Sequence, residues 1–438
     1  MKLNLGISFF LLVLSLGTFA APKMPVASGY KSGRVLCGGE YSKLLVHENG
    51  VFVSVPADYS NPAAGNTEVY AFVAGGKLDS SLPTLIYFTG GPGQGAHWGM
   101  NITNAAFNII LMDQRGIGCS RPSLFSQFVD PGFYSSENVA RDADEIRKYF
   151  GISEVSVYGV SYGTMPATIY GSLFPSVTRS VILEGVVFAQ SKELWESSAR
   201  RQLIQGMLDG LPSEIKEILE SVSRVHGVPN TWLSMLAWDS LLHNDGLNTL
   251  REKFLDLGNP QQLKRLLEHV RGFYEEVTYE PHMLFTINEI PYYMIACQEM
   301  GLALPGISSR DAYVNGKLSP VADEESPRYC AQMGARSRNL YSANKYPLTV
   351  PTYYFQGRDD SATVMSEAVS HFQKVPRGKK SLLLMDKGGH APSMTFLKMD
   401  NVFQLGIFTH AVMGETIPES LVEMFNAENP RYSWTYTR

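Results

Sequence analysis

Short apolar strands alternate with amphipathic helices along this chain, and the alternation stops in the middle and then resumes. Runs rich in β-branched and aromatic residues predict strands at 51–55, 68–73, 84–88, 109–112, 155–158, 180–183, 352–355 and 382–385. Helical periodicity lies between several of them, as at 139–150, where apolar residues recur at three- and four-residue steps. This order predicts an α/β fold with a mostly parallel sheet flanked by helices.

The alternation breaks over residues 188–346. This stretch is rich in Leu, Glu, Lys and Arg and predicts helices, for example at 214–225 and 261–270. The strand pattern returns near Val350. A chain of 438 residues has room for one large domain with an insertion. We therefore expect an α/β core at 21–187 and 347–438, with a helical cap at 188–346 inserted before the last strands.

The first twenty residues resemble an export signal. Lys2 precedes an apolar run at 3–19, and small residues at positions 18 and 20 allow cleavage after Ala20. A membrane anchor is the alternative, but the run is short for a span and contains Asn4, Ser8 and Ser15. We expect a signal peptide at 1–20, a secreted or periplasmic protein, and no membrane attachment after cleavage.

Four cysteines lie in the exported part of the chain: Cys37, Cys119, Cys297 and Cys330. In an oxidising compartment an even number permits disulfides, and the spacing favours Cys37 with Cys119 and Cys297 with Cys330. Buried free thiols are the alternative. The spacing does not resemble a zinc site, so we expect no metal.

The charge balance narrows the class of partner. The chain has 37 basic and 42 acidic residues, a formal net charge of −5. A nucleic-acid-binding protein would need a basic stripe, so we expect no nucleic-acid partner. The composition suits a protein that handles small molecules or peptides. The oligomeric state does not follow from the sequence.

A Gly-Val-Ser-Tyr-Gly motif at 159–163 follows a predicted strand and precedes a helical stretch. This context is typical of a nucleophile elbow, in which glycines permit a sharp turn that lifts the hydroxyl of Ser161 above the sheet. An ordinary glycine turn is the alternative. A tetrahedral oxyanion also needs N–H donors. We expect them to be the backbone N–H groups of Tyr162 and of Gly91, in the glycine loop after strand 84–88.

A serine nucleophile needs a base, and the base needs a carboxylate that orients it. Asp359 and Asp360 follow strand 352–355, and His390 follows strand 382–385 on a glycine loop. Both positions lie at the carboxyl ends of consecutive strands, where open α/β sheets build their sites. The other histidines precede Ser161, lie in the insertion or fall in helical patterns. His390 is therefore the predicted base.

Three motifs together resemble the prolyl aminopeptidase family of α/β-hydrolases, and most of all its secreted, tripeptidyl-aminopeptidase-like branch. They are Gly-Gly-Pro-Gly at 90–93, Asp-Gln-Arg-Gly-Ile-Gly-Cys-Ser at 113–120 and the Ser161 motif. The resemblance runs from about residue 37 to 390 and is weakest in the insertion. It implies an α/β-hydrolase fold and a serine peptidase that removes residues from free peptide N-termini, often at proline, without a cofactor. It also implies a triad of Ser161, His390 and Asp360, with Asp359 still possible as the acid.

Other residues are assigned on this basis. Asp113 and Arg115 are expected to brace the loops around the site. A cationic substrate N-terminus should meet carboxylates, so Glu184, at a strand end, and Glu299, in a Cys-x-acid element of the secreted branch, are predicted to bind substrate. A solvated or salt-bridged side chain is the alternative for both. An esterase or lactonase with the same triad, or a non-catalytic binding protein, would share the fold.

Overall fold

The structure is a computed structural model, and it describes residues 30–38, 49–96, 106–188, 240–256, 289–305 and 330–438, with isolated positions between 202 and 265. Its centre is a nine-stranded sheet of order β1-β2-β4-β3-β5-β6-β7-β8-β9. The strands from β4 to β8 in this order are parallel, whereas β1, β2 and β9 are antiparallel to their neighbours. The predicted mostly parallel sheet is confirmed.

Every predicted strand is present, most of them longer than predicted. The bounds are β1 Val51–Pro56, β2 Asn66–Val73, β3 Thr84–Phe88, β4 Asn108–Met112, β5 Val155–Val160, β6 Thr178–Glu184, β7 Thr352–Gly357 and β8 Lys380–Met385. The sequence interpretation missed β9, Trp434–Thr437. Only Trp434 of this short edge strand is buried, so its pattern carries little apolar signal.

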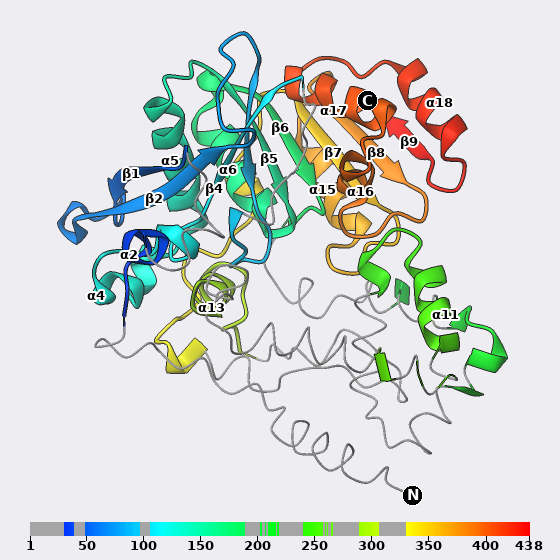
Figure 1. The fold of residues 1–438 in the computed structure, drawn as a ribbon, viewed down its shortest axis with the longest axis horizontal. Coiled ribbons are helices and arrows are strands. Elements are labelled where there is room, and N and C mark those ends of the chain that lie inside the picture. Colours follow the sequence, from blue (N-terminus) through cyan, green and yellow to red (C-terminus); the bar gives the residue numbers. More distant parts are fainter. Residues whose placement is uncertain are drawn as a thin grey trace, which may run out of the picture.

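Helices cover both faces of the sheet (Figure 1). The described helices are α2 Gly33–Gly38, α4 Phe125–Phe128, α5 Ser136–Tyr149, α6 Thr164–Leu173, α11 Gly246–Asp256, α13 Glu289–Gln298, α15 Met365–Lys374, α16 Pro392–Lys398, α17 Val402–Met413 and α18 Glu419–Glu428. One core cluster packs the sheet against α5, α6, α13 and α15, and a second packs it against α16, α17 and α18. Side chains alternate between them, since Val157 of β5 lies in the first and Tyr158 in the second.

The long insertion separates two strands that are neighbours in the sheet. β6 ends at Glu184 and β7 begins at Thr352, yet Glu184 pairs with Phe355. Within the insertion, Figure 1 shows α11 and α13 on the same side of the sheet. α13 contributes Met294 and Ile295 to the first core cluster. The predicted helices at 214–225 and 261–270 lie largely outside the described residues, and the division into core and cap stays a prediction.

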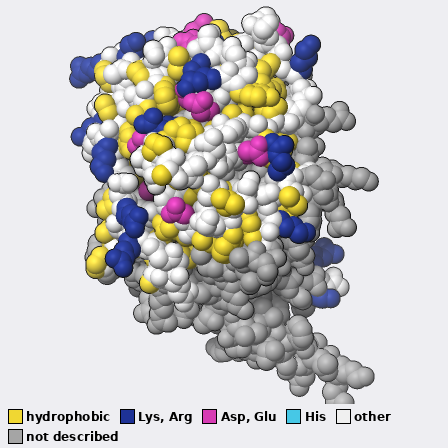
Figure 2. Space-filling view, turned by 90° about the vertical axis from the view of Figure 1, so that its left-hand side faces the viewer, with side chains coloured by type: hydrophobic (Ala, Val, Ile, Leu, Met, Phe, Trp, Pro, Cys, Tyr) yellow, Lys and Arg dark blue, Asp and Glu magenta, His cyan; other side chains and the backbone are white. Residues whose placement is uncertain are grey.

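Two disulfides join the cysteines in the predicted pairs, Cys37 with Cys119 and Cys297 with Cys330. None of the helices in the described part of the chain has the length and apolar character of a membrane span. The predicted signal peptide lies outside the described residues. On the face beside β1 and β2, Lys and Arg side chains are spread among acidic and apolar ones (Figure 2).

Candidate active site

Ser161 occupies a strained turn between β5 and α6. Its φ angle is +56°, in the left-handed region that non-glycine residues rarely adopt. A Cβ at Gly159 would lie 2.1 Å from the carbonyl oxygen of Gly163, and one at Gly163 would lie 2.2 Å from that of Phe88. Both glycines of the motif are therefore required by close backbone contacts, and the turn has the geometry of a nucleophile elbow.

Asp360 and His390 meet at the carboxyl ends of β7 and β8. Both carboxylate oxygens of Asp360 lie 3.0 Å from Nδ1 of His390. Asp360 is fully buried, and it also accepts hydrogen bonds from the backbone N–H groups of Ala362 and Thr363 and the side chains of Gln356 and Thr363. These donors fix the carboxylate, and the carboxylate in turn orients the imidazole.

Asp359 has different surroundings. Its backbone N–H donates to the carbonyl of Gly388 at 3.0 Å. Burial raises the pKa of its carboxyl, and the nearby charge of Asp245 raises it further. Of the two candidate acids, Asp360 is the one that contacts the histidine.

His390 lies beside the end of β6, the strand next to β5. Val160, the residue before Ser161, pairs with Glu184, the residue before Gly185. The imidazole of His390 lies on Gly185, where a Cβ would be 3.0 Å from Cε1. The predicted nucleophile and base thus lie at the carboxyl ends of β5 and β8, and the base contacts the residue that follows β6.

The glycine loop after β3 lies against the nucleophile. A Cβ at Gly90 would lie 3.1 Å from Cβ of Ser161. Gly91 has a φ angle of +106°, and a Cβ there would lie 2.7 Å from the backbone nitrogen of Gly93. The loop is closed by the hydroxyl of Thr89, which donates to the carbonyl of Gln94 at 2.8 Å. Gly91 and Tyr162 therefore lie on the two segments that flank Ser161.

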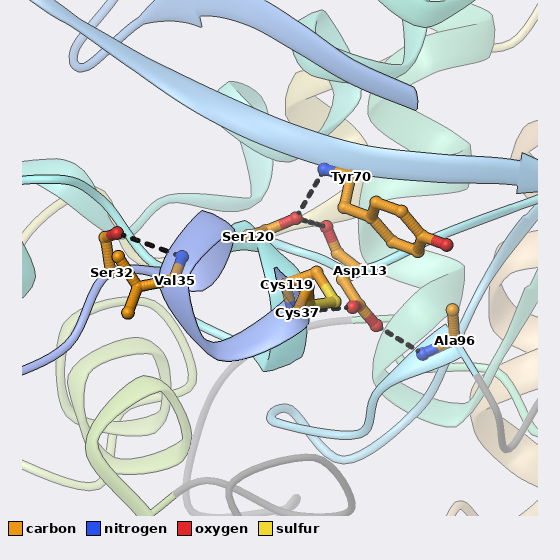
Figure 3. The surroundings of a disulfide bond; sticks show 8 residues. All are labelled: Ser32, Val35, Cys37, Tyr70, Ala96, Asp113, Cys119 and Ser120. Atoms are coloured by element: carbon orange, nitrogen blue, oxygen red, sulfur yellow. Dashed lines mark hydrogen bonds between the residues drawn. A yellow bond between two sulfur atoms is a disulfide. The ribbon is translucent and has the colours of Figure 1, made fainter. Parts of the chain in front are cut away.

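The segment at 113–120 braces this loop (Figure 3). The Asp113 carboxylate accepts from the N–H of Ala96 at 2.7 Å and from the N–H of Cys119 at 2.9 Å. Burial raises the pKa of Asp113 to about 6, although both N–H groups oppose that change. The Ser120 hydroxyl donates to the backbone carbonyl of Asp113 and accepts from the N–H of Tyr70 in β2. The glycine loop after β3 is thereby tied to the Cys37–Cys119 disulfide.

Arg115 makes a second brace. Its buried guanidinium pairs with both carboxylate oxygens of Asp142 on α5, at 2.5 and 2.7 Å. It also donates to the carbonyls of Pro56 and Ala57 at the end of β1. An arginine that makes two hydrogen bonds to one carboxylate fixes the relative orientation of the two groups and also pairs their charges. Asp113 and Arg115 thus make the bracing contacts expected of them.

The structure does not bring Glu184 to a surface that substrate can reach. Its side chain is fully buried on the face of the sheet that carries Ile182, and it accepts from the N–H and the hydroxyl of Ser393, each at 2.6 Å, and from the hydroxyl of Tyr158. Burial raises its pKa, which those hydrogen bonds oppose. Because Ser393 lies in the first turn of α16, Glu184 caps the helix that follows His390.

Glu299 has a similar role at another helix. Its carboxylate accepts from the N–H of Ser136 at 3.0 and 3.1 Å and from the Ser136 hydroxyl, which lies 3.1 Å from the Tyr162 hydroxyl. It is 6% exposed, and burial raises its pKa to about 7 against the opposing effect of Ser136. Glu299 thus caps α5 and contacts the residue after Ser161 through Ser136. Both carboxylates thus make contacts within the protein, and the binding of substrate by Glu184 and Glu299 stays a prediction.

Sequence reasoning missed two groups around His390. The hydroxyl oxygen of Thr363 lies 3.3 Å from Nδ1 of His390. Leu242 and Asn244, in the insertion, contact the loop that carries His390. Neither group belongs to a recognisable motif, and the second lies 145 residues away in sequence.

Comparison with known proteins supports the same fold and class. Residues 83–224 match a family model described as alpha/beta hydrolase fold. A tripeptidyl aminopeptidase from Streptomyces lividans is 26% identical over 194 residues, 33% of this chain and 36% of that protein. A probable proline iminopeptidase from Streptomyces coelicolor is 32% identical over 107 residues, 24% of this chain and 33% of that protein. The alignments thus span about a third of these relatives.

Among solved structures, a proline iminopeptidase from Mycobacterium smegmatis is 16% identical, with a TM-score of 0.45, over 83% of this chain and 99% of that one. The description of the matched family model agrees with the mostly parallel sheet flanked by helices. The names of the curated relatives support the predicted class, a serine peptidase of this fold. The chain therefore has the α/β-hydrolase fold, and its resemblance to the prolyl aminopeptidases and tripeptidyl aminopeptidases is confirmed.

Proposed function

We propose that this protein is a serine hydrolase that removes residues from free peptide N-termini through an acyl-enzyme on Ser161. The observation that carries the proposal is the arrangement of Asp360, His390 and Gly185 beside Ser161. Asp360 contacts Nδ1 of His390 at 3.0 Å, and the imidazole lies on Gly185, which directly follows the sheet partner of Val160. A buried acid, an oriented imidazole and a serine on a strained turn are the parts of a hydrolytic triad.

In the first half-reaction the Ser161 hydroxyl oxygen attacks the scissile carbonyl carbon while His390 Nε2 takes the hydroxyl proton. Asp360 holds the Nδ1 proton and stabilises the imidazolium that forms. The carbonyl oxygen becomes an oxyanion, which accepts from the N–H groups of Gly91 and Tyr162. When the carbon–nitrogen bond breaks, His390 returns the proton to the leaving amine, and an ester of Ser161 remains.

In the second half-reaction water attacks this ester with His390 again as the base. The ester bond breaks, the serine oxygen recovers the proton, and the released fragment carries the new carboxylate. Each step uses only side chains, backbone N–H groups and water. The mechanism therefore needs no metal and no organic cofactor.

The peptide substrate is proposed from the relatives. The proteins that match this chain are named tripeptidyl aminopeptidase and proline iminopeptidase, and both names describe cleavage at a peptide N-terminus. The Gly-Gly-Pro-Gly and Asp-Gln-Arg-Gly motifs, which carry the resemblance, form the loop beside Ser161 and its brace. We expect the helical cap at 188–346 to cover the peptide.

The proposed location is outside the cytoplasm, in the periplasm or the medium. The two disulfides suit an oxidising compartment, as does the signal sequence predicted at 1–20.

Cleavage of matched peptides with free and acetylated N-termini tests the function. An aminopeptidase cleaves the free peptide and leaves the acetylated one intact, because acetylation removes the cationic end. Equal cleavage of both peptides would contradict the aminopeptidase assignment. Turnover of simple esters without any turnover of aminoacyl arylamides would instead identify an esterase that uses the same triad.

A further inference from the structure

A short segment of the insertion lies on the loop that carries His390. The segment consists of residues 240–245, directly before α11, and the loop consists of residues 386–391, between β8 and α16. In Figure 1 the green α11 lies next to the orange loops at the end of β8. The backbone N–H of His390 donates to the carbonyl of Leu242 at 2.8 Å. The N–H of Asp245 donates to the carbonyl of Lys387 at 2.6 Å.

The side-chain amide of Asn244 makes two further contacts, both with the backbone around His390. Its Oδ1 accepts from the N–H of Gly389 at 3.0 Å, and its Nδ2 donates to the carbonyl of Pro392 at 3.2 Å. These two backbone groups lie on either side of His390 in the chain. One side chain therefore spans the catalytic histidine and uses both its acceptor and its donor to do so.

The loop lies so close to this segment that position 389 has no room for a side chain. A Cβ at Gly389 would lie 2.3 Å from the carbonyl oxygen of Leu242 and 2.5 Å from that of His243. The glycine before His390 thus permits the insertion to contact the backbone of the loop directly.

The segment is itself held in place. Asp245 is 8% exposed and pairs with Arg431, which lies just before β9. Its backbone carbonyl accepts from the N–H groups of Asn248 and Thr249 in the first turn of α11. Asp245 and Lys387, which are joined by a backbone hydrogen bond, both have positive φ angles, +55° and +53°. A segment anchored to both a helix and the core can hold the loop that it contacts.

We propose that Asn244 is a positioning residue for the catalytic base, through which the insertion between β6 and β7 holds His390 in register with Ser161. The inference rests on the proposed function. Asp360 and Gly185 fix the imidazole from the side of the sheet, whereas Asn244 fixes the backbone at 389 and 392 from the side of the insertion. A displacement of about 1 Å at a reacting group costs about a hundredfold in rate.

The variant Asn244→Ala tests this role, with Asn248→Ala as the matched control. Asn248 lies in the same insertion, and its side chain donates to Glu252 rather than to the His390 loop. We expect kcat of Asn244→Ala on aminoacyl arylamides to fall about ten- to a hundredfold, with KM within about twofold of wild type. The rate of reaction of Ser161 with a fluorophosphonate should fall by the same factor, because that reaction needs the base and no peptide. Asn248→Ala should keep the wild-type values.

All rates are measured well below the unfolding temperature of each variant, so a loss of stability alone does not change them. A folded Asn244→Ala variant with wild-type kcat and fluorophosphonate rate would overturn the inference, as would an equal loss in Asn248→Ala. If Asn244→Ala does not fold, Asn244→Asp decides by the same criteria, since it keeps the acceptor for Gly389 and loses the donor to Pro392. Wild-type protein that neither hydrolyses acyl substrates nor reacts with the probe would contradict the proposed function instead.

Discussion

The imidazole of His390 rests on the backbone of Gly185. A Cβ at this glycine would lie 3.0 Å from Cε1 and 3.1 Å from Nδ1 of the ring, and its φ angle is +63°. Gly185 directly follows β6, whose last residue pairs with the residue before Ser161. The absence of a side chain at Gly185 therefore permits the base to lie beside the nucleophile.

Replacing Gly185 with alanine should displace the imidazole and lower kcat more than tenfold. The methyl group would contact the ring that Asp360 orients, and a misplaced base transfers its proton poorly. The control is Gly151→Ala, because Gly151 has a φ angle of +65° and no atom within 4 Å of the added Cβ. Both variants share a backbone strain of about 1 kcal/mol. Steady-state kinetics of the two should differ, and equal activities would contradict the contact.

The two neighbouring aspartates should behave differently. Asp360→Asn removes the carboxylate at 3.0 Å from His390, so kcat should fall by roughly four orders of magnitude, as in other serine hydrolytic triads. Asp359→Asn leaves that contact intact and should keep kcat within a few-fold of wild type. The comparison requires only kcat for the two variants. A larger loss in Asp359→Asn would reverse the assignment of the acid.

Glu184 should contribute to stability and not to substrate affinity. Glu184→Ala leaves the buried donors of Ser393 and Tyr158 without their acceptor, at a cost of about 1 to 3 kcal/mol. The expected result is a lower Tm with little change in KM. Glu184→Gln keeps an acceptor oxygen and should lose less. A raised KM at unchanged Tm would restore the substrate-binding role predicted from the sequence.

The pKa of Glu299 gives the stability of the protein a pH dependence. Burial raises that pKa to about 7 from its ordinary value of 4.5, so between these two values the folded state binds more protons than the unfolded state. Stability therefore falls as pH rises from about 4.5 to 7, by up to about 3 kcal/mol for this one group. Asp113, with a pKa raised to about 6, adds an effect of the same sign.

Glu299→Gln, which stays neutral, should remove most of that dependence. Its Tm relative to wild type should rise by a few degrees between pH 4.5 and pH 8, as measured by calorimetry. Glu145→Gln is a suitable control, because Glu145 is a more exposed carboxylate on α5 that pairs with Lys148. An unchanged difference in Tm across this pH range would show that Glu299 ionises in the fold as it does in water.

The sequence was sufficient for the strands and for the motif residues at their ends. β3, for instance, is fully buried, so every position is apolar or β-branched and its bounds follow from composition. β9 has one buried residue in four, and so its pattern does not differ from that of a loop. Ser161, Asp360 and His390 could be predicted because each follows a strand that is largely buried and apolar.

Side-chain direction was harder to predict than position. Glu184 does lie at the carboxyl edge of the sheet, but it shares a strand face with Ile182 and so points into the core beneath α16. The contact of Asn244 with the His390 loop joins segments 145 residues apart, and an asparagine in a helical insertion carries no local signal of such a partner. Only the three-dimensional arrangement brings these residues together.

Covalent labelling tests directly whether Ser161 is the nucleophile. The protein is treated with a fluorophosphonate, digested and mapped by mass spectrometry, beside a Ser161→Ala variant. We expect a single adduct on the peptide that contains Ser161, and neither an adduct nor hydrolysis of aminoacyl arylamides in the variant. An unlabelled wild-type protein, or a Ser161→Ala variant that still hydrolyses these substrates, would contradict it.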